Sequence, residues 1–414
     1  MDPQHHIHRL NNGMRLVMVP HQMSGLVYVS MLMRNGHIDE TAHTRSFAHM
    51  GEHMFSKYTS KKFPEFDEKL FGYLGIDSDA FSSRFNTGYW LLGHKKHTSL
   101  ILQLMASTFF DYEFSDDWEK QKNILMEEIQ SKHNELHERI LSVLYPNHSL
   151  STTSEEHLKC ILHASEHDVT RFLVERLDPK ETLVLLEGDF DMNSLLPTLI
   201  TLFDHPKTLV DYTPSILPVP LLQGPKRIHC SIPSANAASI IYTYQIPNIS
   251  RFDTQSDAIL TMMMRYFCDD YYSHLYQVLR EKHGLVYTFD SSYELSPVRV
   301  IPGELKICIE VNPMYVESVL SIVDAEIDVL KRSIISRKEM DRIQNNVTLK
   351  KSMEDLNKRP GKFVDNCAFY LAWDKPIQTY SEYFEQLLQV TPRDILNMAK
   401  RIFRPKHKLV AIGN

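Results

Sequence analysis

Residues 46–55 read Ser46-Phe47-Ala48-His49-Met50-Gly51-Glu52-His53-Met54-Phe55 and contain the pattern His-x-x-Glu-His. If this stretch is helical, His49 and His53 lie one turn apart on the same face. Two neutral imidazoles so placed can bind one Zn²⁺. Glu52 follows His49 by three residues, so its carboxylate can reach a water molecule beside the metal, where a general base for hydrolysis must lie. The pattern predicts a zinc-binding helix, and a helix with two solvated histidines is the simpler alternative.

A third metal ligand would strengthen this prediction, and the helical run at residues 117–130 offers two adjacent carboxylates, Glu127 and Glu128. Glu127 shares its side of the helix with polar residues, so we expect it to face solvent. Glu128 lies on the inward, apolar stripe with Gln121, Ile124 and Leu125. An inward carboxylate needs a cation or hydrogen-bond donors. Two histidines and one glutamate leave one position of a zinc ion open, which is typical of catalytic rather than structural sites.

At these residues the chain resembles the inverzincin metallopeptidases of the pitrilysin, insulysin and mitochondrial processing peptidase type. In that family, His-x-x-Glu-His is followed about 75 residues later by a glutamate in a Leu-x-Glu-Glu-Ile-like run. The resemblance implies that His49, His53 and Glu128 bind one Zn²⁺ per chain and that Glu52 is the general base. The family usually has another glutamate seven residues before the zinc carboxylate, and here that position is Gln121. An amide can hydrogen-bond a ligand histidine, but it cannot make that histidine more basic.

Two further motifs carry the resemblance. Asp79-Ala80-Phe81 occupies the place where the family usually has Asn-Ala-Tyr or Asn-Ala-Phe, on an edge strand that pairs with the substrate backbone. An ordinary hairpin with an acidic turn is the alternative for this segment. In the second half, which has no His-x-x-Glu-His, Arg280 and Tyr287 look like the family's substrate-clamping pair. The resemblance implies that they donate to the peptide carbonyl and to the oxyanion; alone, they would be read as a surface arginine and a strand aromatic.

Composition limits the class of protein. A chain of 414 residues with 43% hydrophobic residues can form two or three domains. The net charge of −7 argues against nucleic-acid binding. The five cysteines include no Cys-x-x-Cys pair and are typical of reduced thiols in a cytoplasmic protein. We expect a cytoplasmic location and no membrane span, because the sequence shows neither a targeting segment nor a long apolar run.

The two halves of the chain repeat. Residues 168–188 resemble residues 394–413 in their order of helix, proline and strand, and the strand-like stretch 26–33 has a counterpart in 239–245. A shared helix-proline-strand order could also arise by chance. We interpret the pattern as duplication of an α+β unit of about 200 residues. The resemblance implies that each unit is a mainly antiparallel sheet covered by helices and that the two units form half of a clamshell.

The domain boundaries follow from proline content. Five prolines lie in residues 205–227, a composition typical of a stiff linker. We therefore predict a zinc-binding catalytic domain at residues 1–204 and a homologous domain with the Arg280 and Tyr287 pair at residues 228–414.

Together these features predict a zinc-dependent endopeptidase that cleaves short or unfolded peptides, for example in leader-peptide processing or peptide maturation. Related enzymes enclose a chamber with four such units and this chain has two, so the resemblance implies a homodimer or a heterodimer with a related two-unit subunit. Arg280 and Tyr287 would then serve the metal site of the facing chain. One alternative is a weakly active or inactive structural or regulatory subunit of a heterodimeric peptidase. Another is a non-catalytic peptide-binding module that uses the edge strand alone.

Overall fold

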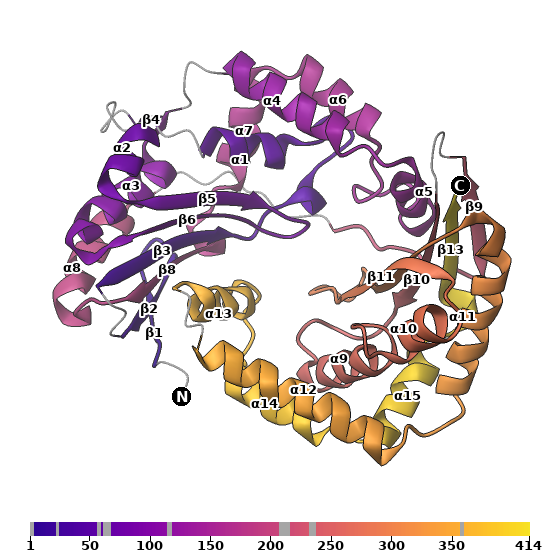
Figure 1. Cartoon of the computed structure of the whole chain (residues 1–414). Helices are drawn as coiled ribbons and strands as arrows, with labels where there is room; N and C mark the ends of the chain where they lie inside the picture. The colour runs from indigo at the N-terminus through magenta and orange to yellow at the C-terminus, as the bar shows by residue number, and fades with distance from the viewer. Residues whose placement is uncertain are drawn as a thin grey trace. The chain divides into compact units, whose positions relative to one another are not determined.

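The computed structural model of the chain describes residues 4–21, 25–55, 59–60, 68–113, 118–206, 216–231, 237–356 and 360–414. The chain forms helices and two main sheets (Figure 1), which confirms the predicted α+β class. It divides into two compact units. The first comprises Met1–His133, Thr152–Ile216 and Lys358–Thr379, and the second comprises Asn134–Ser151, Leu217–Asn357 and Tyr380–Asn414. Within the predicted linker 205–227, residues 207–215 lie outside the described residues.

The first unit is built on a six-stranded sheet of order β1-β2-β8-β3-β6-β5. The strands are β1 (His6–Arg9), β2 (Arg15–Pro20), β3 (Leu26–Met33), β5 (Asp77–Ser82), β6 (Thr87–His94) and β8 (Thr182–Gly188). β2 and β8 are parallel, and the other neighbouring pairs are antiparallel. β3 and β8 are apolar and buried along almost their whole length, because helices cover both faces of the sheet at these central strands.

Alternate side chains of the central strands face two different helical layers. On β3, Val27, Val29 and Met31 pack in the cluster that includes α3 (Thr98–Phe110) and α8 (Met192–Phe203), whereas Tyr28 and Leu32 pack in the cluster that includes α13 (Lys362–Ala372). This is the two-residue period of a strand buried on both faces. The helices of this unit are α1 (Phe47–Phe55), α2 (Glu68–Leu74), α3 (Thr98–Phe110), α4 (Trp118–Ser131), α6 (Ser154–His163), α7 (Glu166–Arg176), α8 (Met192–Phe203) and α13 (Lys362–Ala372). A small two-stranded sheet pairs β4 (Thr59–Ser60) with β7 (Tyr112–Glu113).

The second unit repeats this sheet with five strands, in the order β11-β12-β10-β13-β9. Its strands are β9 (Lys226–Cys230), β10 (Ala238–Ile246), β11 (Val286–Glu294), β12 (Gly303–Val311) and β13 (Lys408–Gly413). β9 and β13 are parallel and the remaining pairs antiparallel, which is the pairing of β2, β8, β3, β6 and β5 in the first unit. The five strands that the two sheets share have the same order and directions, which confirms the predicted duplication.

The helices of the second unit are α5 (Glu135–Leu144), α9 (Thr254–Phe267), α10 (His274–Tyr276), α11 (Val316–Leu330), α12 (Arg337–Leu356), α14 (Tyr380–Gln389) and α15 (Pro392–Ile402). Equivalent helices of the two units share local signals. α7 begins after Ser165 and α15 after Thr391, and each hydroxyl forms a capping box with an aspartate three residues on. α4 ends at Ser131 and α5 begins as a separate helix at Glu135, because the Asn134 side chain accepts a hydrogen bond from His137 N (3.0 Å) and caps α5.

Each sheet is covered by one helix from the other half of the sequence. α13 packs on β8, β2 and β3 of the first sheet, and α5 packs on β13 and β9 of the second. Tyr28 donates to the Asp365 carboxylate of α13 at 3.0 Å, and the buried Glu187 carboxylate accepts from Val364 N at 3.2 Å. α5 and α13 hold the same place in the helix order of the two halves, so the exchange is reciprocal. The compact units therefore differ from the predicted division into residues 1–204 and 228–414, because α5 belongs to the second unit and α13 to the first.

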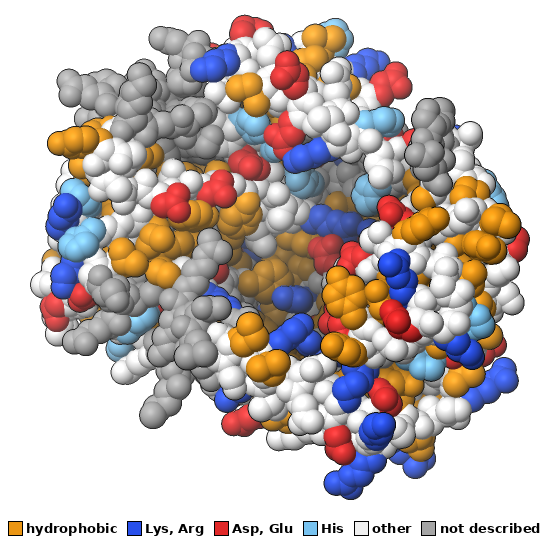
Figure 2. Space-filling model, in the orientation of Figure 1, with side chains coloured by type: hydrophobic (Ala, Val, Ile, Leu, Met, Phe, Trp, Pro, Cys, Tyr) orange, Lys and Arg blue, Asp and Glu red, His pale blue; other side chains and the backbone are white. Residues whose placement is uncertain are grey.

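The described part of the chain has no helix that is both long and apolar enough to cross a membrane. Basic and acidic side chains are both spread over the described part of the face in Figure 2.

Candidate metal centre

α1 carries His49, Glu52 and His53, and its N-terminus is held by a buried carboxylate. Glu40 is 5% exposed and accepts hydrogen bonds from Ser46 N (3.1 Å) and Ala48 N (3.0 Å). A negative charge at this end is favourable because the first N–H groups of a helix have no partner within it. The anchoring of α1 therefore comes from a residue seven positions before its first residue, Phe47, and this role was not expected from the sequence.

The opposite face of α1 packs closely on neighbouring helices. Phe47, Met50 and Met54 are buried in a cluster with residues of α4, α6 and α7. A Cβ atom added to Gly51 would lie 2.4 Å from Leu173 of α7. The absence of a side chain at this position allows α1 to approach α7, and so fixes where the histidines of α1 point.

The structure brings His49, His53 and Glu128 together. Nε2 of His49 lies 3.5 Å from Oε1 of Glu128, and Nε2 of His53 lies 3.4 Å from Oε2 of the same carboxylate. One possible ligand atom from each side chain lies within 4.8 Å of the other two, and this is the only group of three or more His, Cys, Asp or Glu found to converge in this way among the described residues. All three side chains are partly exposed. Two imidazole nitrogens and one carboxylate form a donor set that fits Zn²⁺ and leaves one coordination position open.

The charges at this cluster favour metal binding. Burial, with a further contribution from His53, lowers the pKa of His49 to about 4. His49 is therefore neutral at pH 7, which is the form that binds a metal. Burial opposes ionisation of Glu128, but a hydrogen bond from Lys132 and the nearby His49 outweigh it and hold the pKa of this carboxyl below its ordinary value. Lys132 was not singled out from the sequence, although its four-residue spacing from Glu128 was an available signal.

Helix α4 presents Glu128 as expected, with one difference. Leu125 and Gln121, on the predicted inward stripe, are buried, and Glu127, on the predicted polar side, is exposed. Ile124 was expected on the inward stripe and is 41% exposed, so that part of the prediction is wrong. The inward surface of α4 is narrower than the spacing indicated.

Gln121 lies in the interior near the start of α4. Its side chain is 3% exposed, and its Nε2 has no hydrogen-bond partner among the described residues. A buried amide N–H without a partner is destabilising. No hydrogen bond from this nitrogen to a ligand histidine is therefore formed here, and the influence of Gln121 on the metal stays a prediction.

Glu52 is held from the side of the sheet. The Ser82 hydroxyl donates a hydrogen bond of 2.7 Å to Oε2 of Glu52. Ser82 is the last residue of β5, and β5 packs directly on α1. This contact was not expected from the sequence, since no local pattern links a strand residue to a helix thirty positions away.

The segment Asp79-Ala80-Phe81 lies on β5, which is an edge strand of the first sheet. Ala80 N donates to the Asp79 carboxylate at 2.9 Å, and Ser78 N donates to Asp77 at 3.1 Å. Because main-chain groups alternate between the two sides of a strand, these donors lie on the free edge. An added peptide strand would pair with this edge of β5 and would take the place of the two carboxylates as the acceptor; the role of β5 in binding substrate stays a prediction.

Arg280 and Tyr287 lie in the second unit. Arg280 belongs to a π-helical segment, Gln277–Lys282, and Gly284 follows with φ +65°. Nη1 of Arg280 donates to the main-chain carbonyls of Val286 and Tyr287, both at 2.6 Å. Arg280 thus holds the beginning of β11, whereas the Tyr287 side chain is 61% exposed. The substrate-clamping role of the pair stays a prediction.

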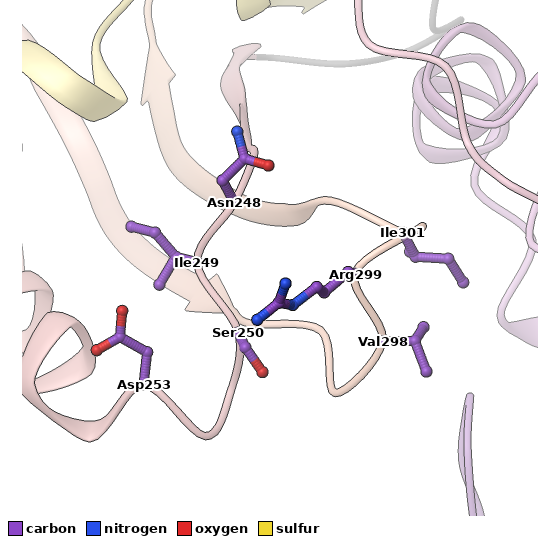
Figure 3. A pocket seen from close by; sticks show the side chains of 7 residues that line it. All are labelled: Asn248, Ile249, Ser250, Asp253, Val298, Arg299 and Ile301. Carbon is purple, nitrogen blue, oxygen red and sulfur yellow. The ribbon is translucent and has the colours of Figure 1, made fainter.

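The second unit also contains a cavity of about 250 Å³ (Figure 3), lined by Asn248, Ile249, Ser250, Asp253, Val298, Arg299 and Ile301. Asp253 caps α9 by accepting a hydrogen bond from Ser256 N. The seven lining residues include one carboxylate and neither histidine nor cysteine. They therefore do not provide the ligand set of a second metal centre.

Two family profiles match the chain. The profile described as "Insulinase (Peptidase family M16)" matches residues 16–160, and "Peptidase M16 inactive domain" matches residues 164–347. This chain belongs to peptidase family M16. The first profile covers α1 and α4 with the candidate metal ligands. The second covers most of the half in which His-x-x-Glu-His is absent, so the predicted family resemblance is confirmed for both halves.

Individual relatives agree with membership of family M16. The chain is 23% identical to "Zinc protease PqqE" of Helicobacter pylori, over 97% of this chain and 91% of that protein. It superimposes on the crystal structure of a protease from Helicobacter pylori with a TM-score of 0.88 and 20% identity, over the full length of both chains. The periplasmic protease PqqL from Escherichia coli gives a TM-score of 0.79 at 13% identity and covers all of this chain and 48% of that one. Since that relative is periplasmic, a cytoplasmic location of this M16 protein stays a prediction.

Proposed function

We propose that this M16 protein is a zinc-dependent endopeptidase that cleaves short or unfolded peptides. The observation that carries the proposal is the convergence of His49, His53 and Glu128, which come from two helices, beside the carboxylate-bearing turn of Glu52. Three protein ligands with an open fourth position are typical of catalytic zinc, whereas a structural site has four protein ligands. The relative named a zinc protease supports the same chemistry.

Different residues of the chain would have different roles in the proposed reaction. Zinc bound by the two histidines and Glu128 would supply Lewis acidity toward the peptide carbonyl and toward water. Glu52 would accept a proton from the attacking water and deliver it to the leaving amine, since it lies one helical turn from the ligand His49. The free edge of β5 would hold the peptide by main-chain hydrogen bonds, and Arg280 and Tyr287 would donate to the oxyanion.

Main-chain recognition by β5 would accept many sequences, provided that the peptide can become extended. This supports short or unfolded substrates, including leader peptides or maturation intermediates, rather than folded proteins. By the family resemblance, the active form is a dimer of identical chains or a heterodimer with a related subunit. Mixing Glu52→Gln chains with Arg280→Ala chains tests for shared sites, because activity that never recovers in the mixture excludes sharing between identical subunits.

Metal content and cleavage must be measured together. We expect about one zinc per wild-type chain and cleavage of a quenched, unfolded peptide that a chelator abolishes and added zinc restores. Glu52→Gln should keep the zinc and lose cleavage, whereas His49→Ala should lose both. His167→Ala, which removes an exposed histidine of α7, is the matched control and should keep both. A zinc-loaded wild type that cleaves no unfolded peptide would refute the proposal and favour the inactive, peptide-binding subunit.

A further inference from the structure

We propose that Ser82 is a positioning residue that orients Glu52 for proton transfer and thereby connects the edge strand to the metal helix. This inference rests on the proposed function and adds a residue to it. The contact that carries it is the hydrogen bond of 2.7 Å from the Ser82 hydroxyl to Oε2 of Glu52. That distance is the usual one for a hydroxyl donor, and a bond to an ionised carboxylate is stronger than one between neutral groups.

The hydrogen bond leaves the other carboxylate oxygen free. Oε1 of Glu52 has no hydrogen-bond partner among the described residues, and Ser82 is the partner that the structure shows for Oε2. A glutamate side chain without such a contact exchanges between rotamers. With Oε2 held by Ser82, Oε1 keeps one direction, and this oxygen would be the one that accepts the proton.

The residues around Ser82 explain why a hydroxyl reaches Glu52 from this strand. On β5, Ala80 and Ser82 share one face because they are two positions apart. Ala80 is buried, and its small side chain allows β5 to approach α1. The space between the two elements is a cavity of about 20 Å³ lined in part by Gly51, Glu52 and Ala80. Removing the hydroxyl would take away the hydrogen-bond donor to Oε2 of Glu52 and leave room for about one water molecule.

Ser82 also lies beside the proposed peptide-binding edge. The preceding residue, Phe81, is 42% exposed, and Ala80 N lies on the free edge of the strand. A peptide added to β5 would therefore stabilise the strand that carries the hydroxyl donor. Peptide binding and orientation of the base would act through the same short segment.

The test compares Ser82→Ala with Ser82→Thr, which restores a hydroxyl on a residue suited to a strand. Ser142→Ala is the control, because it removes an exposed hydroxyl that bonds only within its own helix turn. For Ser82→Ala we expect kcat to fall roughly 10- to 100-fold, the worth of a hydrogen bond to a charged group. KM, zinc content and the midpoint of thermal unfolding should stay at the wild-type values. Ser82→Thr should recover most of kcat, and Ser142→Ala should equal wild type.

A second measurement does not depend on turnover. With Co²⁺ in place of zinc, the visible absorption spectrum reports the surroundings of the metal. We expect Ser82→Ala to change this spectrum in the same direction as Glu52→Gln, and Ser82→Thr to leave it unchanged. Peptide affinity, measured by anisotropy, should be equal for Glu52→Gln and for the double variant Glu52→Gln, Ser82→Ala.

Each outcome decides the matter. An unchanged kcat in Ser82→Ala, a rise in KM alone, or loss of zinc would overturn the positioning role, as would failure of threonine to recover activity. If zinc-loaded wild type cleaves nothing, the proposed function fails. The cobalt spectra then still test whether Ser82 orients Glu52, because they do not depend on turnover. A Ser82→Ala spectrum identical to wild type would then refute it.

Discussion

Zinc-free protein should lose stability in mild acid because His49 is held in its neutral form. Burial first, and His53 second, lower the pKa of His49 from an ordinary value of 6.5 to about 4. In the unfolded chain this histidine has its ordinary pKa, so between pH 6.5 and 4 the unfolded state binds more protons than the folded state. The free energy of unfolding therefore rises with pH across this window and falls as the pH decreases.

The size of the effect follows from the two pKa values. Protonation of His49 in the unfolded chain should make the free energy of unfolding about 3 kcal/mol lower at pH 4 than at pH 7. The side chain is about one-fifth exposed, so solvent screens this value little. The lowered pKa of Glu128 acts at lower pH, because its contribution is present above the ordinary value of 4.5 and is lost as the pH falls through the lowered one.

Urea unfolding of chelator-treated protein between pH 7 and pH 4 measures this term. The unfolding free energy of wild type should fall by about 3 kcal/mol more than that of His49→Gln, which cannot be protonated at this position. His163→Gln, which removes an exposed histidine of α6, should follow wild type. If wild type and His49→Gln show the same pH dependence, His49 is not held neutral by its surroundings and the electrostatic account of the cluster is wrong.

Three further substitutions test the supports of the site and the fold. Gln121→Glu should raise zinc affinity roughly tenfold or more if residue 121 reaches a ligand histidine, as measured by competition with a chelator, and an unchanged affinity would show that it does not. Glu40→Ala should lower the free energy of unfolding by about 2–4 kcal/mol, because two N–H groups at the start of α1 lose a charged acceptor; Glu155→Ala, an exposed acid in the first turn of α6, is its control. Gly361→Ala should destabilise by more than about 1 kcal/mol, since φ is +86° there and the added Cβ would lie 2.6 Å from the Tyr28 ring; equal urea midpoints for this variant and wild type would contradict the described docking of α13.

Predictions from the sequence succeeded where geometry is local or repeated. The four-residue spacing of His49 and His53 places two imidazoles on one side of any helix, because a helical turn has 3.6 residues. Apolar runs marked β3 and β8, and the repeat of helix, proline and strand marked the duplication that the two sheets confirm. The choice of Glu128 over Glu127 also rested on helical spacing, and the structure places Glu128 beside the histidines.

Local spacing misled where tertiary packing sets the outcome. Ile124 satisfies the inward stripe of α4 but is exposed, because the neighbouring elements cover a narrower sector of that helix than the apolar pattern spans. Nothing in the sequence indicated that the Arg280 guanidinium donates to two main-chain carbonyls of β11, and its substrate-clamping role stays a prediction. Helical periodicity states which side chains share a face, and it does not state what lies against that face.

The amino-acid sequence therefore specified the elements, their repetition and the pair of histidines on one side of α1, since these depend on backbone geometry over a few residues. The tertiary structure alone showed that Ser82 binds Glu52, that Glu40 anchors α1, and that α5 and α13 are exchanged between the two sheets. These contacts join residues from separate elements. They arise because close packing of complementary surfaces, such as Gly51 against Leu173, selects one arrangement of elements among many that the same local patterns allow.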